Sequence, residues 1–532
     1  MSALAGTGSL LRLALRRDRI LAPTWIAVFV LMVTYAAAAS IDLYPTIHSR
    51  VTAAQGVNGT AALVALYGRV YEPTIGAISI MKMGGIGGAM IAVLAFMLVV
   101  RHTRAEEESG RLELVSATVV GRTAPLTAAI LTAAGTTLAI GALAAAGLTS
   151  TGLPARGSVA FGLAWAATGI AFTAVGALAA QLTTGGRAAV GISAAFLGLA
   201  YLLRAAGDTT GTDDAGWLSW LSPIGWSQQV RPYAHERWGV LLLLLVFAVV
   251  VGAAAYAIAA RRDLGAGVWA DRPGAASAAP YLSSTSGLAW RLERGALLAW
   301  AAGYVLLGAV VGSVATDIGG FLESPQAREF IAKLGGTKAL TDAFLATEFG
   351  MVGVITSVYA VSVALRLRSE ETTQRAELLL ATSTPRRTWV GSHLLMAVAG
   401  TIALLLTAGL VSGVAYAAQT GDAANVGRVA AAALVQLPAI LVMIGAVVAI
   451  WGTSPRAATG AWVLLVVFLL VGELGPLFEL PQWVMDLSPF GHTPRLPGQE
   501  LRVLPLVVMS LIAVGLTAVG LVAFRRRDVG NA

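Results

Sequence analysis

The sequence of 532 residues contains no cysteine. This absence excludes a disulfide-stapled exterior, thiol catalysis and metal sites ligated by cysteine. Lysine is also rare: the three lysines are Lys82, Lys333 and Lys338, and none of them follows a glycine. Because a phosphate-binding P-loop requires Gly-Lys followed by Ser or Thr, the chain has no Walker A motif and is not itself a P-loop ATPase.

Charge of either sign is scarce as well. Charged residues make up 12% of the chain and hydrophobic residues 57%, whereas soluble domains carry about 25% charged residues. A membrane-spanning helix needs roughly 20 mainly apolar residues. We therefore predict an all-α polytopic membrane protein with about twelve transmembrane helices. The apolar runs lie at 20–40, 77–100, 124–149, 158–182, 188–205, 238–260, 295–315, 348–366, 389–417, 429–451, 457–474 and 504–524.

The basic residues indicate the orientation of the spans. With both termini in the cytoplasm, 23 of the 36 Lys and Arg residues lie in cytoplasmic segments, as the positive-inside rule requires. Arg16, Arg17 and Arg19 precede an apolar run that resembles a signal peptide, but its length and its repetition in the second half indicate an uncleaved first span. Thirty-three arginines stand against three lysines, and alanine and glycine are abundant, as in GC-rich bacterial genomes. We expect a protein of the bacterial inner membrane that contacts lipid and, lacking a separate basic domain, no nucleic acid.

Two halves of the chain repeat each other. Four matches occur in the same order in both halves: Arg16–Arg19 with Arg291–Arg294, Arg104–Thr118 with Arg368–Thr382, Leu221–Gly225 with Leu487–Gly491, and Arg261–Gly265 with Arg526–Gly530. We predict two six-helix halves, residues 1–262 and 288–532, joined by a cytoplasmic linker at 263–287. Because each half has an even number of spans, the halves are parallel repeats about an axis along the membrane normal.

Two charged segments, residues 104–122 and 368–386, follow the second span of each half. We expect each to form a helix in which Glu107 pairs with Arg111, and Glu371 with Arg375, four residues apart. One interpretation is an interfacial helix beside the lipid headgroups. The other, which the duplication favours, is a docking helix for a soluble partner of twofold symmetry.

Some other residues bear on two alternative functions. A proton-coupled carrier needs ionisable groups in the middle of the membrane, but Lys82 and Glu473 lie at the outer ends of their spans. A membrane-bound transferase could use Asp213 and Asp214, although no histidine cluster supports a metal site there. The glycine-rich run Gly84–Gly88 has the spacing that allows close packing of transmembrane helices.

The arrangement of these features resembles a known family. A basic lead-in before the first span, a charged helix after the second and a helical outer hairpin before the sixth resemble the permeases of type-two ATP-binding-cassette exporters. The fused form, with R-x-E-E and R-x-E-L in both halves and R-R-D after the last span of each, is similar to the actinobacterial permeases that export polyketide antibiotics or other drugs. Tetronasin-type exporters are the named example.

This resemblance implies a separate ATPase subunit, a homodimer that binds ATP and Mg, and a hydrophobic or amphipathic small molecule as cargo; the chain itself would hold no cofactor. It implies connecting helices that contain Arg16, Arg19, Arg291 and Arg294. Its ATPase-coupling residues correspond to Glu106, Glu107, Arg111, Glu113, Arg122, Glu370, Glu371, Arg375, Glu377 and Arg386. A substrate cavity between the halves would be lined by Met83, Met90, Phe96, Phe196, Met351, Tyr359 and Phe468. The outer stretch 41–76, partly matched by 316–347, is longer than in compact exporters of this type.

Overall fold

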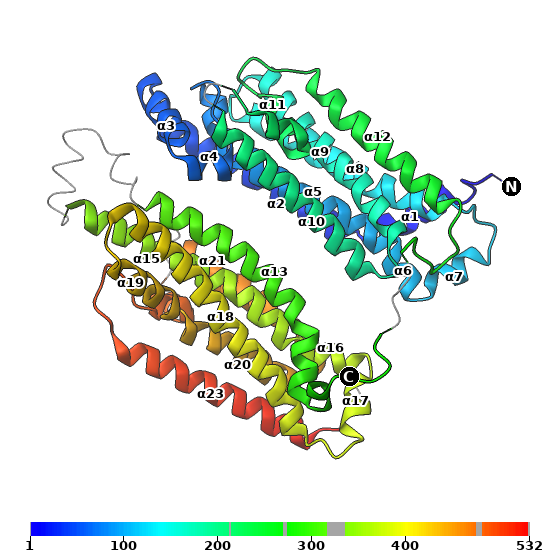
Figure 1. The fold of residues 1–532 in the computed structure, drawn as a ribbon, viewed down its shortest axis with the longest axis vertical. Helices are drawn as coiled ribbons and strands as arrows, with labels where there is room; N and C mark the ends of the chain where they lie inside the picture. Colours follow the sequence, from blue (N-terminus) through cyan, green and yellow to red (C-terminus); the bar gives the residue numbers. More distant parts are fainter. Residues whose placement is uncertain (1, 212–213, 270–273, 316–335, 475–480, 530–532) are drawn as a thin grey trace. The chain divides into compact units, whose positions relative to one another are not determined.

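The computed structural model describes residues 2–211, 214–269, 274–315, 336–474 and 481–529. The chain divides into two compact units, Met1–Gly274 and Ala275–Ala532, and each is a bundle of long helices (Figure 1). The described residues contain no strand. The predicted all-α polytopic fold is therefore confirmed.

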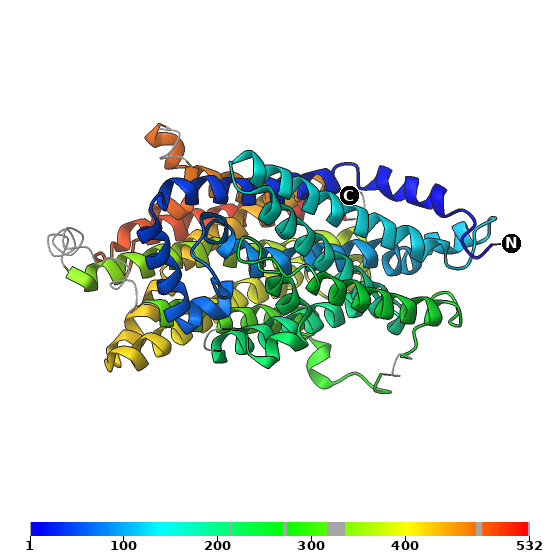
Figure 2. The same cartoon turned by 90° about the horizontal axis from the view of Figure 1, so that it is seen from above.

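The first unit contains six long helices: α2 (Leu21–Leu43), α5 (Ile75–His102), α8 (Ala124–Ser150), α9 (Ala155–Leu182), α10 (Gly186–Thr210) and α12 (Val240–Ala259). Short helices connect them: α1 (Thr7–Arg17), α3 (Ile47–Gly59), α4 (Ala61–Tyr67), α6 (Arg104–Glu108), α7 (Arg111–Ser116), η1 (Trp217–Leu221) and α11 (Pro223–Gln229). Helix α1 lies at the same end of this unit as α6 and α7, whereas α3, α4 and α11 lie at the opposite end (Figures 1 and 2).

The second unit has a similar order of elements. Its longer helices are α13 (Thr285–Val314), α15 (Gly336–Ala364), α18 (Arg386–Thr420), α19 (Ala424–Leu434), α20 (Leu437–Thr453), α21 (Gly460–Leu474) and α23 (Val503–Arg526). Its short helices are η2 (Pro280–Ser283), α16 (Arg366–Thr372), α17 (Arg375–Leu380), η4 (Pro455–Ala457), α22 (Gln482–Met485) and η5 (Pro489–His492). Helices α19 and α20 together form one continuous apolar span.

The number of spans differs slightly from the expectation of twelve. Among the described residues, 11 helices are long and apolar enough to cross a membrane. The predicted span at 457–474 is α21, which has 15 helical residues within the described range that ends at residue 474, against the roughly 20 that a bilayer requires. The other eleven predicted runs each coincide with one of the long helices.

Helix α9 is the centre of the first unit. It contacts α5, α8, α10 and α12, and 83% of its apolar window is buried, against 11% for α12. Glycines allow the closest of these contacts. A Cβ atom on Gly141 of α8 would lie 2.3 Å from the carbonyl oxygen of Gly162 on α9, so only glycine lets the two backbones meet. Gly452 on α20 and Gly520 on α23 form the same kind of contact in the second unit.

The glycine run Gly84–Gly88 packs differently from the prediction. Instead of another helix backbone, large side chains occupy the space beside it. A Cβ atom on Gly85 would lie 2.7 Å from Nε2 of Gln228, and one on Gly87 would lie 2.4 Å from Cζ2 of Trp165. The missing side chains of Gly85 and Gly87 thus leave room for Gln228 and Trp165 to pack against α5. A larger residue at either position would displace them.

Candidate functional site

Each charged segment forms two short helices rather than the single helix that we expected. Helices α6 and α7 are separated by Gly110, with φ 70°, and α16 and α17 by Gln374, with φ 59°. This left-handed conformation ends a helix and is uncommon for residues other than glycine. We call residues 104–116 the first elbow and residues 366–380 the second elbow.

The turn within each elbow changes the expected ion pairs. Arg111 pairs with Glu106 at 3.6 Å, and Arg375 pairs with Glu370 at 3.8 Å. The predicted pairs of Arg111 with Glu107 and of Arg375 with Glu371 are wrong, because the left-handed residue breaks the helical register between the partners. Both arginine side chains are more than half exposed, so these pairs add little to stability.

Glu107 of the first elbow points into the protein. Its carboxylate accepts hydrogen bonds from Arg262, at 2.5 Å, and from Arg104, at 2.6 Å. Its side chain is 5% exposed. Arg262 follows α12, so Glu107 joins the first elbow to the end of the last span in its unit.

Glu371 holds the corresponding position in the second elbow. Its side chain is 0% exposed and forms an ion pair with Arg527, which follows α23. Nη2 of Arg527 donates to it at 2.8 Å, and Nε1 of Trp451 donates at 2.9 Å. The two halves thus place the same kind of buried carboxylate against an arginine that follows the last span.

A second contact strengthens this attachment in both units. Arg122 donates to the carbonyl oxygen of Arg262 at 2.7 Å, and Arg386 donates to the carbonyl oxygens of Phe524 and Arg527 at 2.9 and 2.8 Å. An arginine at the carbonyl end of a helix satisfies unpaired backbone acceptors and interacts favourably with the helix dipole. We call the buried glutamate, its arginine and this capping arginine the elbow clamp.

The acidic residues of the connecting helices were not among the predicted site residues. Asp18 is 1% exposed and pairs with Arg101 and His102, at 3.1 and 2.5 Å. Glu293 is buried in the second unit and pairs with Arg366 at 3.2 Å. The signal that could have found them is the repeated pattern Arg-x-Asp/Glu-Arg. The arginines predicted instead, Arg16, Arg19, Arg291 and Arg294, are all exposed.

The elbows also present matching residues to the solvent. Leu114 is 76% exposed and Leu378 is 75% exposed. Glu113 and Glu377 lie beside them and are exposed as well. We call these four residues the elbow surface. Because the two leucines and the two glutamates occupy equivalent positions of the repeated segments, the elbow surface presents the same groups in each unit, as a partner of twofold symmetry requires.

The predicted cavity-lining residues separate into two groups. Phe96 and Tyr359 are buried in the core of their own units, so neither side chain reaches a surface. Met83 packs against a core cluster, while Met90 is partly exposed.

The remaining three residues lie beside open space or other rings. Phe196 stacks on Phe247 with ring centroids 6.0 Å apart. Met351 and Phe468 line one cavity of about 310 Å³ in the second unit. Two of the seven predicted residues are therefore brought together at a cavity.

Asp214, one of the two candidate transferase residues, is paired with arginines. It forms ion pairs with Arg231 and Arg237, while its predicted partner Asp213 lies outside the described residues. Among the residues that the structure describes, no group of three histidine, aspartate or glutamate side chains could hold a metal ion.

Comparison with known proteins completes the description of the site. Residues 282–525 match the family model described as "Multidrug efflux system permease Rv1217c, C-terminal domain". Over 531 residues the chain is 46% identical to the multidrug efflux system permease protein Rv1217c of Mycobacterium tuberculosis, covering 99% of this chain and 96% of the relative. With its long apolar helices and this relationship, the chain belongs to the family of multi-pass membrane permeases represented by Rv1217c.

Proposed function

We propose that this chain is the transmembrane subunit of an ATP-binding-cassette exporter in the bacterial inner membrane, with both termini in the cytoplasm. ATP and Mg bind to a separate ATPase homodimer, and the cargo is a hydrophobic or amphipathic drug or polyketide antibiotic. The observation that supports this most is the repeated elbow, which exposes a Glu-Leu pair in each unit. The printed name of the relative, a multidrug efflux permease, supports the choice of cargo.

The elbow clamp gives a physical route from a partner to the spans. A subunit that moves Leu114 also moves Glu107 on the same elbow, and Glu107 is bonded to the arginine at the end of α12. In the second unit, Leu378 is connected through Glu371 to the end of α23. Because a buried charge pair resists separation, each elbow and the end of its last span move together.

One observation favours the rival, a proton-coupled carrier. Arg204 and Asp208 are buried in the apolar helix α10, and their charged groups lie 3.6 Å apart. Buried ionisable residues within spans often mark proton pathways. Here, however, Asp208 accepts a hydrogen bond from Ser219 at 2.6 Å, and Arg204 donates to the carbonyl oxygens of Val64 and Leu66 in α4. These bonds fix η1 and α4 to α10, which is a structural role.

Aspartate at the elbow surface is expected to prevent assembly. We expect the double variant Leu114→Asp, Leu378→Asp to lose about 2 kcal/mol or more of ATPase binding, because two exposed leucines would otherwise be buried by the partner. This corresponds to about thirtyfold weaker binding. Co-purification of the ATPase with tagged permease measures it. Tyr281→Asp, an exposed side chain of η2 outside the elbows, is the control. Normal co-purification of the double variant would show that the elbows do not dock the ATPase.

The orientation of the chain in the membrane can be tested at the two ends of one helix. Ser383 and Gln419 are exposed and lie at opposite ends of α18, and the natural chain has no cysteine. In intact cells, Gln419→Cys should react with a membrane-impermeant thiol reagent, and Ser383→Cys should react only after the cells are opened. Labelling in the reverse order would place the elbows outside the cell.

A further inference from the structure

A cavity of about 310 Å³ lies in the first unit, beside the elbow clamp that Glu107, Arg122 and Arg262 form there. All three of these residues line the cavity, and Leu112 of α7 and Leu126 of α8 supply apolar walls. Sites for small molecules measure roughly 300–1,000 Å³. The cavity is therefore large enough for one small molecule.

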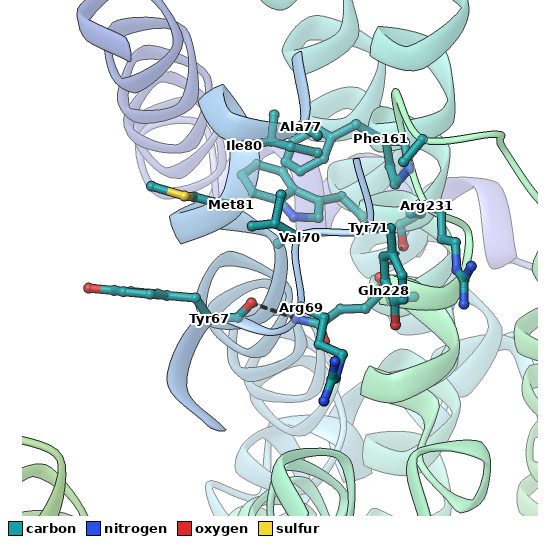
Figure 3. Close-up of a pocket in the computed structure, with 16 residues that line it drawn as sticks. Tyr67, Arg69, Val70, Tyr71, Ala77, Ile80, Met81, Phe161, Gln228 and Arg231 are labelled. Atoms are coloured by element: carbon teal, nitrogen blue, oxygen red, sulfur yellow. Dashed lines mark hydrogen bonds between the residues drawn. The ribbon is translucent and has the colours of Figure 1, made fainter. Parts of the chain in front are cut away.

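Figure 3 shows another recess of the same unit, at the end that carries α11. Tyr67 and Gln228 are among the residues that line it, and its volume is about 60 Å³. Because one water molecule takes up about 30 Å³ in the liquid, this recess has room for only a few waters. Of the two, the cavity beside the clamp is the one that a larger molecule can enter.

The second unit fills the corresponding place with aromatic rings. Trp389 lies three residues after the capping arginine, Arg386, and Phe524 lies three residues before the other arginine of the clamp. Both side chains are 1% exposed, and their ring centroids lie 5.8 Å apart. Trp451 packs on Phe524 with a centroid distance of 4.6 Å. The clamp of the second unit thus lies against a packed aromatic cluster.

The first unit has small residues at the two matching positions. Pro125 lies three residues after the capping arginine, Arg122. Ala259 lies three residues before Arg262. The repeat therefore aligns these two residues with the tryptophan and the phenylalanine of the second unit, and both of them line the cavity. The cavity exists in the first unit because two aromatic side chains are missing from it.

The arginines of the second clamp lie over its rings. The guanidinium carbon of Arg527 is 5.1 Å from the ring centroid of Phe524 and 5.2 Å from that of Trp451. That of Arg386 is 5.4 Å from the centroid of Phe524. An arginine within about 6 Å of a ring centroid is attracted by the ring. In the part of the chain that the structure describes, the equivalent arginines of the first unit lie over no ring.

Hydrogen bonds hold the arginines of the first clamp by their edges. Arg262 pairs with Glu107, and its Nε donates to Oε1 of Gln181 at 2.6 Å. Arg122 donates to the carbonyl oxygen of Arg262 at 2.7 Å. A guanidinium group is planar, its donors point outward in its own plane, and its faces stack on aromatic rings. A ring can therefore stack on these arginines without breaking their hydrogen bonds.

The charges around the cavity favour an uncharged ligand. Two carboxylates, those of Glu107 and Asp263, and two guanidinium groups line it. An anion would meet the carboxylates and a cation would meet the arginines, and like charges repel strongly at such short range. A neutral aromatic molecule avoids both repulsions, because its attraction to a cation comes from the quadrupole of the ring.

We propose that this cavity binds a flat, uncharged aromatic molecule, whose rings take the places that Trp389 and Phe524 occupy in the second unit. The molecule stacks on Arg122 and Arg262 and connects α8 with α12, as the two side chains connect α18 with α23. An effect of the bound molecule on coupling to the ATPase rests on the proposed function, whereas its binding does not.

Indole is a suitable probe, because it is the ring system of tryptophan and carries no charge. The full chain is purified in lipid nanodiscs without any ATPase, so failure of the exporter proposal cannot affect the result. Because the natural chain has no cysteine, Val120→Cys places a single thiol in the cavity wall, and its rate of reaction with N-ethylmaleimide is measured. The control is Val119→Cys, whose side chain is 74% exposed and outside the cavity. Leu264→Cys, also in the wall, is a second reporter should Val120→Cys fold poorly.

We expect indole to slow the reaction at both reporters but not at Val119→Cys. Cyclooctanol, a saturated molecule of similar size, should need about a two- to fivefold higher concentration for half protection, the range of one cation–π contact. Adding Ala259→Phe to a reporter should abolish protection, because the new ring fills the site. Ala260→Phe, the same change at the exposed neighbouring residue, should leave protection intact.

Absence of protection at both reporters, or equal protection at Val119→Cys, would show that indole does not bind in this cavity and would overturn the proposal. Equal half-protection concentrations of indole and cyclooctanol would contradict the aromatic assignment. Full protection in the presence of Ala259→Phe would place the bound ring elsewhere. Should Ala259→Phe fail to fold, Pro125→Trp fills the same cavity from α8 and is judged by the same criterion.

Discussion

Replacing Glu371 by lysine is expected to detach the second elbow from α23 and abolish export. The glutamate side chain is 0% exposed and pairs with Arg527, so Glu371→Lys would bury two positive charges side by side. It would also leave Nε1 of Trp451 without its acceptor. Removing one partner of a buried ion pair costs about 3–5 kcal/mol, and a lysine in its place adds repulsion. Thermal unfolding of the purified permease and drug accumulation in cells measure the two effects.

The matched control is Glu377→Lys, which makes the same charge change at an exposed position of the same elbow. It should leave the unfolding temperature unchanged and affect only ATPase binding. Glu107→Lys should behave like Glu371→Lys in the first unit, because Glu107 has the same type of partner. If Glu371→Lys unfolds at the temperature of the natural chain, the elbow clamp does not hold the second elbow.

The positions of the spans could be predicted because they depend on composition and length. Helix α18 was expected over 389–417 and is found at Arg386–Thr420, since a long apolar run has no alternative in lipid. The exception is α21, where the run at 457–474 is apolar enough but the helix begins only at Gly460, which leaves 15 helical residues within the described range. Pro455 and η4 precede this helix, and a proline favours such an irregular start.

The geometry of the elbows could not be predicted in the same way. Glycine at 110 is a plausible end for a helix, but Gln374 adopts the same left-handed conformation without any signal in its residue type. Glu106 and Glu107 are adjacent and chemically identical, yet one faces Arg111 near the surface and the other faces Arg262 inside. Which of the two glutamates points inward depends on where the last span ends in three dimensions.

The packing of Trp165 and Gln228 beside the glycine run of α5 could not be predicted either. Trp165 and Gln228 belong to α9 and α11, and nothing in either local pattern brings them together. The spacing of the glycine run beside them predicts close helix packing, whereas the run contacts these two side chains. The repeat Arg261–Gly265 with Arg526–Gly530, in contrast, did contain the information for the elbow clamp, because Arg262 and Arg527 occupy equivalent positions.

We also expect drug efflux by this permease to depend on ATP hydrolysis. The chain has no Gly-Lys dipeptide for a P-loop of its own, and the buried Asp208 is held by hydrogen bonds that suit a structural role. Under the proposed function, transport against a gradient takes its energy from a separate ATPase. The two elbows, each connected to the last span of its unit, are the parts of the chain best suited to receive it.

The most direct test measures drug efflux from membrane vesicles that contain this permease with its wild-type ATPase, with an ATPase inactivated in its Walker A motif, or with none. Each preparation is assayed with and without a proton uncoupler. We predict efflux only with the wild-type ATPase and ATP, at a rate that the uncoupler does not change. Efflux by the permease alone that collapses when the uncoupler is added would contradict the proposal and establish a proton-coupled carrier.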